Sequence, residues 1–189
     1  MKAALSQLIQ EHRLIDSVLK ALQGAADDCQ QTQSLDLHHA EDIVAFLDHF
    51  AEKNHCRKEE AYFVPLLQRR GVDLKKQPCH EALEAHELES LHVANLQAAL
   101  REYREACDRF VHHARQFVAL LTDHMARESR DLFPHALKAL ENSDWERLAV
   151  AFDRFEEELG REGVRKWVRL GERLAQANDP SRAVGHGSP

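Results

Sequence analysis

The sequence predicts an all-α fold, a bundle of long helices, and three observations lead to this prediction. The 189 residues contain seven glycines and five prolines, and no glycine occurs between Gly71 and Gly160, which favours helix over sheet. Apolar side chains recur at the three- and four-residue spacing of amphipathic helices. The length suits one domain of ordinary size that can bury a core without crosslinks.

Charge and hydropathy exclude several functional classes. The formal net charge is −7 and no long Lys/Arg run occurs, so we expect neither a nucleic-acid partner nor a membrane partner. No apolar run approaches the roughly 20 residues needed to cross a bilayer. The amino terminus lacks the apolar core and cleavage site of a signal peptide, and we therefore expect a cytoplasmic protein.

The cysteines are widely separated and form no CxxC motif. This spacing is typical of reduced thiols and not of a disulfide framework or a thiolate zinc site. The prediction covers all four: Cys29, Cys56, Cys79 and Cys107.

Six helices are predicted from periodicity and helix-breaking residues. The first covers about residues 3–22, with Gly24 beginning its exit, and residues 27–36 form a polar connection. The second is long, ends at Gly71 and should be kinked by Pro65.

The remaining helices follow similar signals. Pro78 suits the first turn of the third helix, which runs toward Tyr103, and the fourth again contains a late proline, Pro134. The spacing of Ser143 and Glu146 predicts a capping box that opens the fifth helix. Gly160 and Gly163 then separate it from a short sixth helix over residues 167–174. We therefore expect a four-helix bundle over 1–141, a helical extension packed on it over 142–176, and a disordered tail over 177–189.

A weak internal repeat relates the second and fourth helices at an offset of 69 residues. His55 corresponds to His124, Glu59 to Glu128, and the two late prolines to each other. A histidine and a glutamate four positions later share a helix face, so each pair can direct an imidazole and a carboxylate into the same volume. One such pair is common on solvated helices, whereas two matched pairs indicate a metal site.

The first and third helices each offer another histidine, His12 and His86. If four antiparallel helices bring the four histidines to one level, each turn must lie near the midpoint between consecutive histidines. The midpoints fall near residues 33–34, 70–71 and 105. The first lies in the polar connection and the second on Gly71, while the third has no turn-forming residue nearby. Most of the other histidines, such as His38, His39, His112 and His113, are interpreted as solvent-facing or boundary residues.

These segments together resemble the hemerythrin-like family, also called the HHE cation-binding domain. The resemblance covers about residues 3–140 and rests on LIQEHRLIDSVLKAL, HCRKEEAYFVPLL, EAHELE and HMARESRDLFPHAL, in that order and spacing. It implies an up-down-up-down four-helix bundle around two non-haem iron ions bridged by an oxo or hydroxo group. Carried over, His12 and His55 would bind one iron, His86 and His124 the other, and Glu59 and Glu128 would bridge them. Imidazole and carboxylate donors suit Fe, Mn or Zn.

The sequence departs from the respiratory hemerythrins at Ser90. Those proteins place a second histidine four residues after the first on the third helix, and serine is a poor iron ligand. Either the second iron has an additional open position, or Glu89 supplies an oxygen. Cys56, which follows His55 directly, is interpreted as a packing residue, and Glu60 as a carboxylate that is either solvated or supports a metal ligand from outside.

Three functional hypotheses remain. The first is a di-iron protein that binds or reduces O2, peroxide or nitric oxide at an open iron position; the sequence does not decide whether it turns over as an enzyme. The second is an iron- or oxygen-sensing module that signals through its C-terminal helices, which could also contact a second copy of the chain or another protein. The third is a metal-free histidine phosphotransfer domain, which needs no carboxylate partners. A ferritin-like store is disfavoured because it uses Glu-x-x-His spacing.

Overall fold

The computed structural model describes residues 2–73, 79–101 and 106–178, and every regular element in these ranges is helical. The α-helices are α1 (Ala3–Thr32), α2 (Leu37–Phe46), α3 (Val64–Arg69), α4 (Cys79–Arg101), α5 (Ala106–Arg127), α6 (Phe133–Ala139), α7 (Asn142–Leu159) and α8 (Arg161–Ala177). Three π-helical segments interrupt them: η1 (Leu47–Cys56), η2 (Glu59–Phe63) and η3 (Glu128–Leu132). The all-α prediction is confirmed.

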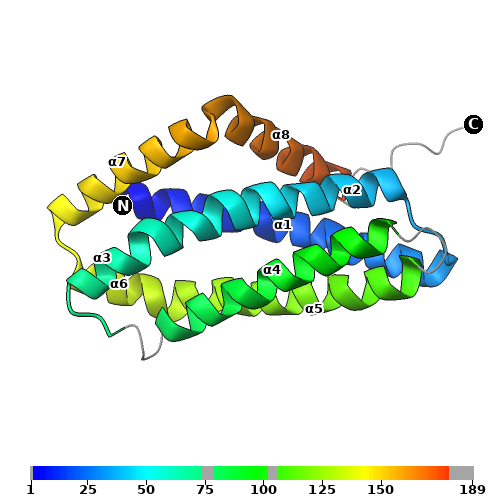
Figure 1. Cartoon of the computed structure of the whole chain (residues 1–189), viewed down its shortest axis with the longest axis horizontal. Helices are drawn as coiled ribbons and strands as arrows, with labels where there is room; N and C mark the ends of the chain where they lie inside the picture. The colour runs from blue at the N-terminus through cyan, green and yellow to red at the C-terminus, as the bar shows by residue number, and fades with distance from the viewer. Residues whose placement is uncertain (1, 74–78, 102–105, 179–189) are drawn as a thin grey trace, which may run out of the picture.

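Four long helical stretches lie alongside one another: α1, α2 to α3, α4, and α5 to α6 (Figure 1). Helices α7 and α8 cross one side of this group, next to α1. The buried apolar residues form two clusters, and the two clusters meet along α1, where Leu8 belongs to one and Ile15 to the other. A layer of buried polar side chains lies between them, and it includes His12.

Helix α1 is longer than the sequence predicted. It passes through Gly24 and ends at Thr32, and Gln33 then adopts a left-handed conformation with φ 55°. The glycine costs a helix interior only about 1 kcal/mol, which packing can offset, and Ala26 and Cys29 beyond it are fully buried. The turn at Gln33 agrees with the midpoint predicted at residues 33–34.

The two late prolines follow π-helical turns. In each case a backbone N–H reaches five residues back, from Val64 to the carbonyl of Glu59 and from Phe133 to that of Glu128. Pro65 and Pro134 then occupy early positions of α3 and α6, where a missing N–H costs little. A π-helical turn thus precedes Pro65, while the kink itself stays a prediction. The turn after α3 contains Gly71 at φ +85°, as predicted from its glycine.

Helix α7 begins differently from the prediction. Its capping box is made by Glu141 and Asp144 and not by Ser143 and Glu146. The buried carboxylate of Asp144 also receives Arg70 Nε at 2.8 Å, which fastens the start of α7 to the end of α3. The Arg70 hydrogen bond holds the pKa of Asp144 well below its usual range. Asp144 therefore stays ionised at neutral pH and keeps its ion pair with Arg70.

Helix α8 is longer than the predicted short helix and contains Gly163 within its first turn. It packs closely at Gly171, where a Cβ atom would lie 2.5 Å from Cε2 of Phe46 and 3.1 Å from Cδ1 of Leu14. Glycine is required there because any larger residue would displace the aromatic ring. The C-terminal extension is thus in tight contact with α1 and α2.

The prediction of four reduced thiols is wrong for one pair. Cys29 and Cys107 are joined by a disulfide, with their Cα atoms 5.9 Å apart. The pairing was hidden in the sequence because 78 residues separate the two cysteines, while the packing of α1 against α5 brings them together. Cys56 is a free, buried thiol.

Three predictions fall on residues that the structure leaves undescribed. Pro78, the turn near residue 105, and most of the tail from 179 to 189 lie outside the described ranges. Within those ranges, no helix combines the length and apolar character that a bilayer-spanning segment needs.

Candidate metal centre

The structure brings together all six side chains that the sequence singled out. They come from separate stretches: His12 from α1, His55 from η1, Glu59 from η2, His86 from α4, His124 from α5 and Glu128 from η3. Each of the six is at most 7% exposed. Six polar side chains buried at one level of a helical core are unfavourable unless they hold something.

The six residues form two clusters that share both carboxylates. His12 and His55 lie with Glu59 and Glu128 in one cluster, and His86 and His124 lie with the same two glutamates in the other. In each cluster one donor atom from every residue lies within 4.8 Å of the others. Each cluster is compact enough to surround a single ion.

Glu59 faces both histidine pairs. Its Oε1 lies 3.7 Å from Nε2 of His55, and its Oε2 lies 3.5 Å from Nε2 of His86. The two oxygens of one carboxylate are thus divided between the two clusters.

Glu128 lies between the clusters in a similar way. Its Oε2 is 3.1 Å from Nε2 of His12 and 3.4 Å from Nε2 of His124. With Glu59, it gives the site two anionic groups placed between two pairs of imidazoles.

Several donor atoms are left without hydrogen bonds. Both oxygens of Glu59 and Nε2 of His86 and of His124 are buried and complete no hydrogen bond with the described residues. Buried polar atoms normally find a partner, and leaving one unpaired costs about 1–3 kcal/mol. Divalent cations would satisfy these atoms, and the set of imidazole nitrogens and carboxylate oxygens suits Fe, Mn or Zn. The residues therefore fit a metal pair.

Protons compete with metal for these histidines. Burial lowers the pKa of His124, but the negative charge of the adjacent Glu128 outweighs burial and raises it to about 9. Burial likewise opposes protonation of His55, yet the charge of Glu59 and the hydrogen bond to Glu11 raise its pKa overall. Burial raises the pKa of Glu128, and the nearby His124 and His12 more than reverse this and lower it well below the usual range. Without metal, protonated imidazoles balance the buried carboxylates.

Two further carboxylates orient the imidazoles from outside the clusters. Nδ1 of His55 is 2.8 Å from Oε2 of Glu11, and Nδ1 of His86 is 3.1 Å from Oε1 of Glu60. A carboxylate that accepts from Nδ1 leaves Nε2 as the free donor atom directed into the centre. Glu60 thus contacts a site histidine from outside the clusters, in agreement with one of its two interpretations from the sequence.

Ser90, the position at which the sequence departs from the respiratory hemerythrins, and its neighbour Glu89 make different contacts. Ser90 Oγ donates to Oε1 of Glu52 at 2.8 Å and so has a partner outside the clusters. Glu89, by contrast, is 4% exposed, and its Oε1 lies 3.8 Å from Nδ1 of His124. Cys56, His86 and Glu89 make a third buried group with converging donor atoms. The carboxylate of Glu89, which the sequence indicated as an alternative oxygen ligand, therefore lies next to the histidine His124 of the second cluster.

The sequence did not indicate the contacts of Glu11 and Lys58. Glu11 and Lys58 directly precede His12 and Glu59, and a helical neighbour points about 100° away, toward a different helix. Only the tertiary packing shows what they contact. Among the other histidines, His38 and His112 are exposed and His39 and His113 are partly exposed, as predicted.

Comparison with known proteins supports the resemblance seen in the sequence. The family described as "Hemerythrin HHE cation binding domain" matches residues 3–136, which is well over half of the chain. No curated protein and no solved structure matched the chain. The match spans all six buried histidines and glutamates of the two clusters. The chain therefore belongs to the hemerythrin HHE cation-binding domain family.

Proposed function

We propose that this protein is a non-haem di-iron protein of hemerythrin type that binds or reduces a small oxidant such as O2, peroxide or nitric oxide. Residues 1–141 would form the up-down-up-down bundle and residues 142–176 an extension packed on it. The observation that carries the proposal is that two histidine pairs share the same two carboxylates, Glu59 and Glu128. Two cations a few ångströms apart repel one another, and shared anions offset that repulsion.

Each cluster would leave room for a ligand from solution. His12, His55, Glu59 and Glu128 offer four side chains, which is fewer than the six positions of an octahedral ion. A redox-active metal pair supplies electrons to an oxidant that binds at such a position. Iron is proposed because the family resemblance implies it and because zinc has no redox chemistry.

The chain's own residues would hold the ligands in place and limit access of water. The two apolar clusters lie on either side of the polar layer, and the ring of Phe133 stacks on His12 with centroids 5.4 Å apart. Glu11 and Glu60 fix the tautomers of His55 and His86. A dry, oriented site of this kind strengthens ionic contacts to a bound ligand.

Metal analysis of the purified protein, together with its ultraviolet-visible spectrum, tests the proposal. We expect close to two irons per chain and near-ultraviolet charge-transfer bands that shift on addition of azide. Substoichiometric metal with a featureless spectrum, after reconstitution with Fe²⁺ under nitrogen, would rule the proposal out.

The second candidate, a sensing module that signals through the C-terminal helices, is favoured by one observation. Lys58, beside the bridging Glu59, forms an ion pair with Glu156 of α7. Val150 and Leu159 on the same helix are about half exposed and offer an apolar contact for a second copy or another protein. Light scattering of the iron-loaded and the iron-free protein would test this candidate. Signalling through a contact with a second copy requires that the two forms differ in oligomeric state.

A further inference from the structure

A buried lysine connects the candidate metal centre to the C-terminal extension. The side chain of Lys58 is fully buried, and its ammonium group pairs with Glu11 of α1 and, at 2.8 Å, with Oε1 of Glu156 on α7. The same ammonium lies 5.6 Å from the ring centroid of Phe152, also on α7. A fully buried ammonium is costly unless it is paired, and Glu11 and Glu156 supply its two carboxylate partners.

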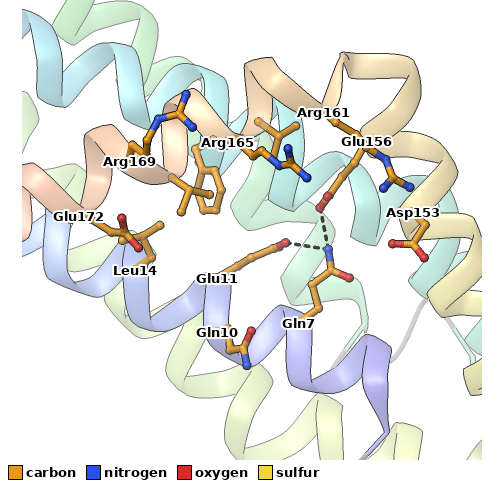
Figure 2. Close-up of a pocket in the computed structure, with 13 residues that line it drawn as sticks. Gln7, Gln10, Glu11, Leu14, Asp153, Glu156, Arg161, Arg165, Arg169 and Glu172 are labelled. Atoms are coloured by element: carbon orange, nitrogen blue, oxygen red, sulfur yellow. Dashed lines mark hydrogen bonds between the residues drawn. The ribbon is translucent and has the colours of Figure 1, made fainter.

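Gln7 closes this arrangement into a ring. Its Nε2 donates to Oε1 of Glu156 at 2.6 Å and lies 3.3 Å from Oε1 of Glu11 (Figure 2). Glu11 therefore uses Oε1 for Lys58 and Gln7, while its Oε2 receives Nδ1 of His55. Burial raises the pKa of Glu11, but His55 and Lys58 lower it overall, so this carboxyl stays ionised. The Glu11 carboxylate thus contacts His55 with one oxygen and, with the other, contacts Lys58 and Gln7, which both bind Glu156 of α7.

The ring is reached from solvent by a cavity of about 530 Å³ between α1, α7 and α8. Gln7, Glu11 and Glu156 line it, and Arg161, Arg165 and Arg169 of α8 lie along its edge (Figure 2). Glu156 keeps 22% of its side chain exposed, whereas Lys58 has none. The contact between α7 and Lys58 can therefore change without opening the core.

We infer, on the basis of the proposed function, that Glu156 is a positioning residue for the metal centre. Through Lys58 and Glu11 it orients His55, and the C-terminal extension thereby sets the affinity of the His12/His55 cluster. The other cluster has its own orienting carboxylate, Glu60 on His86, which does not contact Lys58 in the described contacts. The effect of Glu156 is therefore confined to one of the two metals.

Loss of the Glu156 charge would alter the ring in a defined way. Lys58 would then be balanced by Glu11 alone, which weakens the acceptor available to Nδ1 of His55. A less basic imidazole binds metal less tightly, and outer carboxylates of this kind typically contribute about 10–100-fold to metal affinity. Because Glu156 acts through two intermediates, we expect an effect of up to about tenfold, smaller than that of Glu11→Gln.

The test is release of Fe²⁺ from the loaded full-length protein to an excess of chelator under nitrogen, followed as two kinetic phases. Glu156→Gln should speed one phase, Glu11→Gln should speed the same phase more, and Glu60→Gln should speed the other. Glu157→Gln is the matched control, since it removes the same charge from an exposed neighbour that pairs with Arg161. It should behave as the wild type.

Two outcomes overturn the inference. In the first, Glu156→Gln releases iron at the same rate as Glu157→Gln. In the second, Glu156→Gln speeds both phases equally and lowers the melting temperature of the iron-free protein, which indicates a structural role only. A wild-type protein that never holds two irons would instead overturn the proposed function. A selective change in one phase, with the iron-free melting temperature unchanged, supports the inference.

Discussion

Nε2 of His12 lies 3.0 Å from Nε2 of His55, although the two residues belong to different helical stretches. Two imidazole lone pairs cannot face each other at this distance without repulsion, so either a proton or a metal ion must lie between them. The pair thus makes metal binding a competition with protons.

Metal affinity should rise with pH. His124 has its pKa raised to about 9, so at neutral pH it holds a proton that a metal must displace, and the raised pKa of His55 adds to this competition. We expect the affinity for Fe²⁺ to increase by roughly tenfold per pH unit for each proton released, up to about pH 9. Titrations under nitrogen at several pH values, in weakly buffered solution with proton release recorded, measure this. An affinity independent of pH would show that the imidazoles are neutral before metal binds.

The iron-free protein should have the opposite pH dependence. A histidine whose pKa is raised on folding contributes stability that is complete below about pH 6.5, its unfolded value, and that is lost as pH rises through about 9 for His124. We therefore expect chelation to lower the melting temperature by about 10 °C at neutral pH, and the gap to the loaded protein to widen toward pH 9. Thermal unfolding of both forms across this range tests the prediction. Equal melting temperatures with and without metal would contradict a buried site.

Removing a shared carboxylate should cost both metals. Glu59→Ala or Glu128→Ala takes one ligand from each cluster and leaves a single shared carboxylate between the two cations, so we expect metal content to fall to about zero per chain. His12→Ala or His86→Ala touches one cluster and should keep about one metal. Glu87→Ala, at an exposed position of α4, is the control and should retain both. Two metals retained in either shared-glutamate variant would show that these residues do not bridge.

The Ser90 position decides how open the His86/His124 cluster is. Ser90 bonds Glu52, while Glu89 is buried near His124, so the two residues offer different outcomes. If that metal has an additional open position, wild type should bind azide and Ser90→His should weaken binding, because position 90 shares a helix face with His86. Azide titrations of wild type, Ser90→His and Glu89→Ala, followed by the charge-transfer band, measure this. No azide binding to wild type but tight binding to Glu89→Ala would show that Glu89 closes the site.

The sequence predicted which histidines and glutamates come together better than it predicted the helices that carry them. HxxxE pairs can be found because residues four apart share a helix face, and the repeat at 69 residues matched Glu59 with Glu128. The end of α1 was misplaced at Gly24 because intrinsic propensity is a weak term that tertiary packing overrides.

Other features depend on contacts between distant parts of the chain. The link from Glu11 through Lys58 to Glu156 joins α1, the second long stretch and α7, and no spacing in the sequence encodes it. The π-helical turns at Glu59 and Glu128 are similarly invisible, since a proline predicts a disruption of the helix and not its form.

The disulfide between α1 and α5 limits how far the two helices can slide along each other. Cys29 lies 17 residues after His12, and Cys107 lies 17 residues before His124, so the bond is about 25 Å along the helices from both histidines. Equal lengths of helix from a fixed point bring the two histidines to the same height. A slip of α1 along α5 by one turn would separate them by about 5 Å, more than a metal–ligand bond can span. A covalent bond near one end of the two helices thus holds the buried histidines at matching heights.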